Sequence, residues 1–184
     1  MKKNFLSCSS LFILSITLLT ACGVGSVAPP SPARPTTAVI TLSTSVTGNI
    51  SGDTTINGYD VTIALPAGVT VKSTTAPPQT DSGVVTSTGS AAGSSMTAVY
   101  TPATTTIPGQ VRILIANANG YYAGEFSKVN CNISAGYYPT TSDFQQPTFA
   151  ASGLFHTHLG YPDDVITNVD LTGQLSMIEA ISIH

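Results

Sequence analysis

Apolar side chains recur at every second residue in the middle of this chain. The clearest run alternates from Tyr59 through Val61 and Ile63 to Leu65, with polar or small residues between them. Successive residues of a β-strand point to opposite faces, so this pattern predicts a strand that is buried on one side. The Pro-Ala-Gly sequence at 66–68 predicts where that strand ends.

The same period of two predicts that the rest of the chain is built from short strands. It is clear over 111–115 and 129–133, and it is weaker over 37–46, 83–88, 96–101 and 145–151. Asn and Gly at 117–120 predict a turn, and 163–171 is interpreted as a loop. Residues 171–183 fit a helix or a strand, and the β context favours the strand. We therefore expect an all-β, antiparallel β-sandwich.

The cysteines limit how this domain can be stabilised. The chain has three, at Cys8, Cys22 and Cys131. If neither Cys8 nor Cys22 belongs to the folded domain, Cys131 has no partner for a disulfide within it. A domain of about 150 residues still buries roughly 70% of its unfolded surface and needs no cross-link for a core. Cys131 lies on the apolar parity of its predicted strand, which predicts a buried structural thiol.

The first residues have the order of a secretory signal peptide, predicted over 1–21. Lys2 and Lys3 are followed by an apolar run at 11–19, which is too short to span a membrane. The sequence Leu-Thr-Ala-Cys that ends at Cys22 resembles the lipobox of bacterial lipoproteins. The resemblance implies that Cys22 carries lipid and anchors the mature protein to a membrane of the cell envelope, such as the outer membrane or cell surface.

Residues 22–36 contain the proposed lipidated cysteine and a linker with four prolines. Such a composition is typical of a semi-rigid tether that could hold the domain away from the membrane. We therefore expect one folded domain, over 37–184.

Three later segments, 58–69, 108–116 and 124–133, resemble strands of cohesin domains in their order and spacing. Each combines an alternating strand with a glycine at or near its start. The resemblance implies a cohesin-like, jelly-roll sandwich of about nine strands, a fold shared with some carbohydrate-binding modules. It also implies binding or assembly without catalysis. Residues 163–171 faintly resemble the end of a dockerin calcium repeat, but the preceding ligands are missing, so calcium is not carried over.

Tyrosines supply the candidate ligand-binding residues. They occur as two pairs and one single residue: Tyr121, Tyr122, Tyr137, Tyr138 and Tyr161. Aromatic rings on loops can stack on sugars or anchor a protein partner. The alternative, which the sequence favours, is that one tyrosine of each pair packs at a strand end with its hydroxyl in water. The chain has no tryptophan, the usual platform of sugar-binding modules, which weighs against the carbohydrate interpretation.

A second candidate is a metal site at His156 and His158. Residues i and i+2 of a strand share a face, so both imidazoles could bind one ion, with Asp163 or Asp164 completing the site. Such a histidine site would suit a transition metal. An exposed polar segment is the interpretation that the sequence favours. Asp163, Asp164 and Asp170, with Asn168, could instead supply oxygen ligands for calcium, but their spacing matches no known calcium loop, and a solvated acidic turn is the favoured interpretation.

The composition also excludes some functions. Charged residues make up only 8% of the chain and the net charge is −3, which argues against a nucleic-acid partner. Motifs for a serine nucleophile elbow, a dinucleotide site or a P-loop do not occur. The leading hypothesis is a non-catalytic, lipid-anchored protein that binds another protein or assembles with its own copies. The alternatives are a module that binds polysaccharide and a small metal-dependent hydrolase around the two histidines.

Overall fold

The computed structural model describes residues 33–74 and 78–184. In this part of the chain there are ten β-strands and three 3₁₀ helices of three residues each. The expectation of an all-β protein is therefore confirmed. None of the described helices has the length and apolar character needed to span a bilayer.

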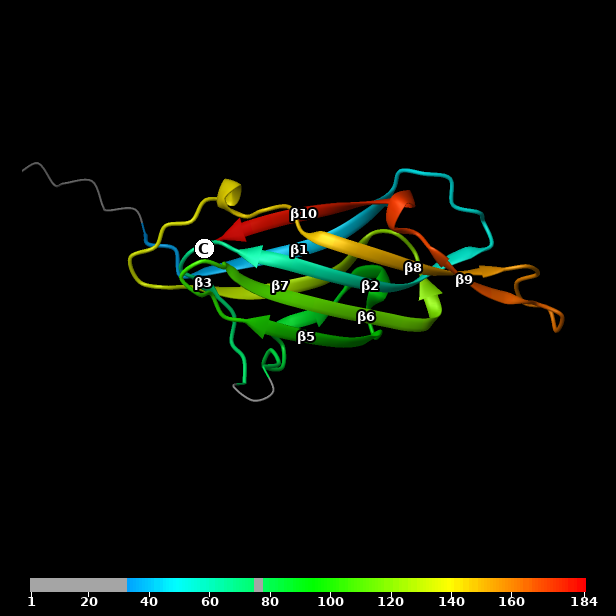
Figure 1. Ribbon diagram of the computed structural model, residues 1–184, viewed down its shortest axis with the longest axis horizontal. Helices are drawn as coiled ribbons and strands as arrows, with labels where there is room; N and C mark the ends of the chain where they lie inside the picture. Colours follow the sequence, from blue (N-terminus) through cyan, green and yellow to red (C-terminus); the bar gives the residue numbers. More distant parts are fainter. Residues whose placement is uncertain (1–32, 75–77) are drawn as a thin grey trace, which may run out of the picture. The chain divides into compact units, whose positions relative to one another are not determined.

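One sheet, called sheet A, has β1 and β7 at its centre. Its strand order is β10-β1-β7-β3 (Figure 1). Strand β4 pairs with the same edge of β7 as β3. The strands are β1 (Thr37–Val46), β3 (Val69–Thr70), β4 (Val85–Ser87), β7 (Glu125–Ile133) and β10 (Leu175–Ile183). Every pairing is antiparallel.

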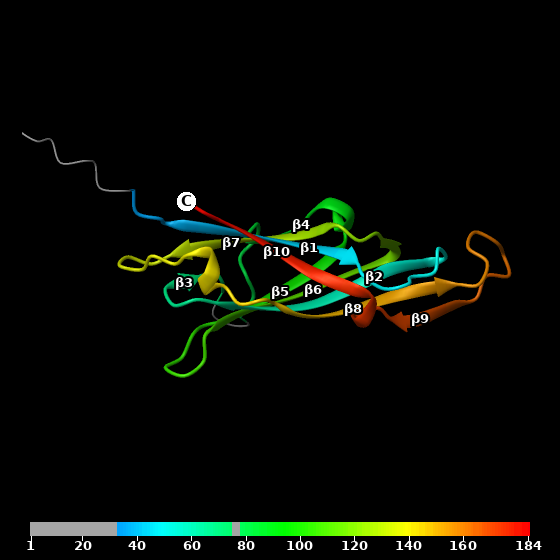
Figure 2. The ribbon, with the colours of Figure 1, turned by 90° about the horizontal axis from the view of Figure 1, so that it is seen from above.

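The second sheet, called sheet B, has the order β5-β6-β2-β8-β9 and is also antiparallel throughout. Its strands are β2 (Thr54–Leu65), β5 (Ser95–Thr101), β6 (Gly109–Tyr121), β8 (Thr148–His156) and β9 (Ile166–Asp170). The view from above shows sheet A and sheet B as two layers (Figure 2). The 3₁₀ helices η1 (Gly89–Ala91), η2 (Thr141–Asp143) and η3 (Thr172–Gln174) lie in the connections.

The predicted parity of β2 is confirmed. Tyr59, Val61, Ile63 and Leu65 are all buried, whereas Thr62 between them is partly exposed. They belong to a single core cluster to which strands of both sheets contribute, and burial of this apolar surface is the main driving force for folding. The structure is thus a β-sandwich.

The C-terminal segment is a strand, as the β context indicated. All nine residues of β10 pair with β1, from Leu175 opposite Val46 to Ile183 opposite Ala38. Leu175 and Met177 point into the core. Glu179 has the same parity, so this carboxyl group also points inward.

Two local predictions were wrong. Residues 117–120 do not end a strand, because β6 continues to Tyr121 and the extra residues form a bulge where Ile56 pairs with Tyr121 and Gly58 with Ala116. Gly120 has a φ of 70° there, so the Asn and Gly signal marked the bulge. Most of the predicted loop at 163–171 is strand β9, whose short, polar sequence gave little alternation to detect.

The predicted signal peptide at 1–21, the lipid site Cys22 and most of the linker at 22–36 lie outside the described residues. These features remain predictions. The described chain begins beside its own C-terminus, since the Thr36 and Thr37 amides both donate to the His184 carbonyl, at 2.7 and 3.0 Å.

Candidate functional site

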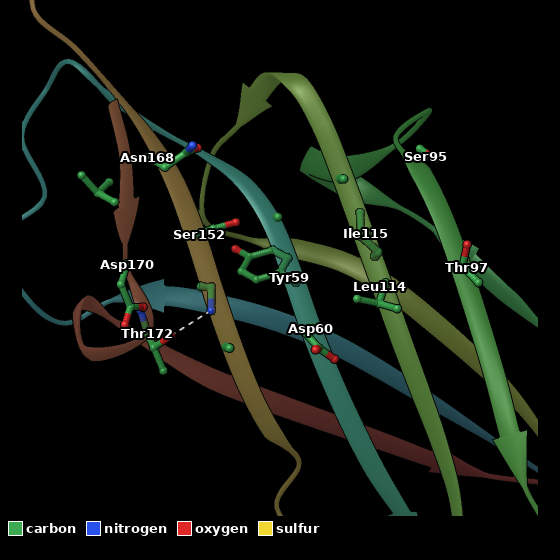
Figure 3. Close-up of a pocket in the computed structure, with 15 residues that line it drawn as sticks. Tyr59, Asp60, Ser95, Thr97, Leu114, Ile115, Ser152, Asn168, Asp170 and Thr172 are labelled. Atoms are coloured by element: carbon green, nitrogen blue, oxygen red, sulfur yellow. Dashed lines mark hydrogen bonds between the residues drawn. The ribbon is translucent and has the colours of Figure 1, made fainter. Parts of the chain in front are cut away.

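A groove crosses the outer face of sheet B. It has a volume of about 690 Å³ and contacts all five strands of the sheet (Figure 3). The groove exists because small residues occupy the outward positions of the central strands, where longer side chains would fill the space. Those residues are Gly58 on β2, Ala116 on β6, and Ala150 and Ser152 on β8.

Gly58 contributes to the shape of this groove, because any side chain here would force the Ser152 side chain to move. A Cβ atom at this position would lie 2.8 Å from the Ser152 hydroxyl oxygen, closer than real contacts allow. Leu114 lies beside the groove with 42% of its surface exposed. Hydroxyls of Ser95 and Thr97 border it on β5. The surface is therefore mostly apolar, with hydroxyl groups at its border.

The two carboxyl groups beside the groove already have partners within the chain. Asp60 forms an ion pair with Arg112 at 2.6 Å, and the hydrogen bond from Arg112 lowers the pKa of Asp60. Asp170 accepts the backbone N–H of Thr172 at 2.9 Å, which lowers its pKa as well. Both groups are ionised at neutral pH, so neither is held as the proton donor that general acid catalysis needs.

The predicted metal ligands lie in the β8–β9 hairpin but do not form one site. His156 is the last residue of β8 and His158 lies beyond it, so the expected shared strand face does not exist. His156 Nδ1 lies 2.6 Å from Asp164 Oδ2, and His158 Nδ1 lies 3.2 Å from Asp163 Oδ1. No group of three or more His, Cys, Asp or Glu side chains that could hold a metal occurs in the described ranges.

These contacts order the turn of the hairpin instead. The His156 and Asp164 side chains are each only 12% exposed, and Asp164 also accepts the backbone N–H of His158. The hydrogen bond with His156 is the main cause of a lowered pKa at Asp164. His158 stacks on Tyr161, with ring centroids 3.6 Å apart. Exposed apolar side chains surround this turn: Leu159, Tyr161, Val165 and Ile166.

The predicted tyrosine site is also dispersed. Tyr121 is buried, which contradicts its proposed role in binding, because the parity of β6 points its ring inward, with its centroid 5.4 Å from that of Tyr59. Tyr122, Tyr137, Tyr138 and Tyr161 are exposed. The expectation that one tyrosine of each pair is packed therefore holds for the first pair and fails for the second.

The exposed tyrosines lie at opposite ends of the sandwich. Tyr137 and Tyr138 lie near Pro66, after the end of β2. Tyr122 follows Tyr121, which pairs with Ile56 near the start of β2. The four rings therefore do not form a common surface.

Cys131 is buried, as predicted, and burial raises the pKa of its thiol to about 12.

Comparisons with known proteins give no further assignment: no family model, curated protein or solved structure matches the chain.

The sequence interpretation missed the groove. The sequence feature that could have indicated it is a small residue at an outward-facing position in each of three strands: Gly58, Ala116 and Ala150. That signal acquires meaning only when these strands are known to be neighbours, and strand order is a tertiary property.

Proposed function

We propose that this chain is a non-catalytic, lipid-anchored protein of the cell envelope that binds another protein in the groove of sheet B. The observation that carries the proposal is the groove itself, about 690 Å³ in volume and lined mainly by small, apolar groups. This volume lies within the roughly 300–1,000 Å³ typical of ligand sites.

The chemistry of the groove favours a protein segment as the ligand. Small residues such as Gly58 and Ala150 let a peptide backbone or an apolar side chain approach closely. The hydroxyls of Ser95 and Thr97 can hydrogen-bond a backbone at the border. Asp60 and Asp170 are already bonded to Arg112 and to the Thr172 amide, so the groove offers a ligand mainly apolar surface and hydroxyl groups. A jelly-roll, cohesin-like topology would agree with this role and is part of the proposal.

A carbohydrate ligand is the second candidate. The exposed stack of His158 on Tyr161 favours it, because such a flat surface can accept a sugar ring. The separation of the tyrosines into two ends of the sandwich makes it the weaker proposal. The hydrolase hypothesis around His156 and His158 has no supporting metal cluster among the described side chains.

A pair of matched substitutions tests the protein-binding proposal. Ala150→Arg places a long cation in the groove, whereas Ala180→Arg places the same side chain on β10 of sheet A. Both alanines are exposed in their strands. The purified protein and both variants would be immobilised, exposed to envelope extract and analysed by mass spectrometry.

We expect one specific protein to be retained by the parent and by Ala180→Arg, and to be lost with Ala150→Arg. Equal retention by both variants would contradict the groove as the site. Retention of polysaccharide alone would replace the protein ligand with the second candidate.

A further inference from the structure

The edges of the two sheets differ in how they are protected. An open edge strand presents unpaired N–H and C=O groups that can pair with another chain. On β5, the Ala98 carbonyl accepts the Thr80 amide at 3.0 Å, and the Tyr100 amide donates to Pro78 at 3.3 Å. The backbone of residues 78–80 therefore covers the outer edge of β5.

The edge at β10 is protected in another way. The Met177 carbonyl accepts a hydrogen bond from the Gln146 side chain at 3.2 Å. Glu179 points inward from the same strand. An inward-pointing ionisable side chain on an edge strand is a known device against pairing, because a second strand would bury it further.

Strand β9 has neither kind of protection. The Val165 carbonyl accepts the Thr157 amide, and the Leu171 amide donates to Ala151, so odd-numbered residues of this segment bond to β8. By the alternation of an antiparallel ladder, the backbone groups of Ile166, Asn168 and Asp170 point away from β8. In the strand order of sheet B, β9 is the last strand and β8 is its only strand neighbour among the described residues (Figure 2).

We propose that β9 pairs in antiparallel fashion with β9 of a second copy of this chain, about a two-fold axis at Asn168. In this register, Asn168 lies opposite Asn168 of the copy, and Ile166 lies opposite Asp170. The outward groups of three residues on each strand would form the ladder. The exposed side chains of Val165 and Ile166 would be covered in part by the partner. Asn168 and Asp170 also line the groove, but the pairing uses the outward backbone groups of β9 and does not depend on the groove's ligand.

The charges near β9 favour a second copy over a basic strand of another protein. Asp163 and Asp164 have His158 and His156 as partners, and Asp170 accepts the Thr172 amide. These carboxylates are therefore already stabilised within the chain. The two-fold register also places Asp170 opposite an apolar residue, so no two like charges face each other across the ladder.

The contact is expected to be weak in free solution. A strand of five residues buries less than the roughly 1,200 Å² of a stable complex. Tethering to one membrane would raise the effective concentration and favour the dimer.

Cysteine trapping tests this register. Opposed residues of a hydrogen-bonded antiparallel pair have Cα atoms about 5.5 Å apart, a distance that a disulfide can bridge. Asn168→Cys should give a disulfide-linked dimer under mild oxidation at high protein concentration. Ile166→Cys should give little, because it faces Asp170 of the copy. The unsubstituted protein controls for its own three cysteines.

Analytical ultracentrifugation supplies the second measurement. The purified protein should show a reversible dimer at sub-millimolar concentration, and Asn168→Pro should shift it to monomer by removing the central outward donor. Circular dichroism would check that this variant is folded. A monomer at all concentrations, together with equal cross-linking of Asn168→Cys and Ile166→Cys, would overturn the proposal. Binding of a basic strand-forming peptide to β9 without dimerisation would also overturn it.

Discussion

Replacing Glu179 with Gln should make the stability of this protein less dependent on pH. Glu179 points into the sandwich from edge strand β10, opposite Leu42 of β1. Its Oε1 atom is buried and has no hydrogen-bond partner among the described residues. Burial raises the pKa of this carboxyl group from 4.5 to about 7.

The size of the effect follows from this shift. A difference of one pKa unit corresponds to about 1.4 kcal/mol, so the full shift would amount to roughly 3.4 kcal/mol. The side chain is only partly buried, so solvent screening reduces our expectation to about 1–2 kcal/mol. Because the folded state favours the protonated carboxyl, this contribution is fully present below pH 4.5 and is lost as the pH rises through 7.

Urea unfolding at several pH values from 4.5 to 8 would measure the effect. The free energy of unfolding of the parent should fall by about 1–2 kcal/mol relative to Glu179→Gln over this range. Glu125→Gln is the matched control. Glu125 is paired with Lys128 at 3.2 Å and has a lowered pKa. Its contribution to the free energy of unfolding is therefore lost only at acidic pH. A constant difference between the parent and Glu179→Gln would refute the inference of a buried, protonated carboxyl.

Three further predictions concern the core. Ile63→Ala should lower the free energy of unfolding by about 2–5 kcal/mol, and Thr62→Ala by less than half as much, because only Ile63 is fully buried; equal losses in urea unfolding would contradict the strand parity. Tyr59→Phe should cost about 0.5–1.5 kcal/mol, because it removes the buried hydrogen bond between the Tyr59 hydroxyl and Thr44 Oγ1, 2.6 Å apart. Tyr121→Phe should be close to neutral in the same assay, since its buried hydroxyl has no partner in the described part of the chain; the reverse order would be evidence against the assigned contacts. The raised pKa of Cys131, about 12, predicts no alkylation in the folded protein at pH 8 and rapid alkylation in denaturant, measured on its peptide by mass spectrometry; labelling of the folded protein would show that the thiol is accessible.

Strand parity was the part of the fold that the sequence carried most clearly. β2 and β7 direct alternate side chains into the core, and burial of one face imposes a period of two on the sequence. The buried thiol of Cys131 followed from the same rule. The C-terminal strand could be favoured but not decided locally, because its pairing with β1 joins residues that are far apart in the chain.

The candidate site could be predicted only in part. Tyr122 and Tyr161 are exposed, but Tyr121 is buried, because β6 continues past the predicted turn and pairs Tyr121 with the buried Ile56. His156 and His158 lie beside Asp164 and Asp163, but the hairpin separates them into two pairs, so the predicted shared metal site does not form.

By itself, the sequence determined the class of the protein: an all-β chain with buried alternate residues and few charges. It also supplies the only indication of a secretory leader and a lipid anchor. Tertiary structure alone decided which strands are neighbours, and with them the groove at Gly58 and Ala150, the open edge at β9 and the inward position of Glu179. The physical reason is that side-chain parity is a local property of each strand, whereas strand order depends on contacts between distant segments.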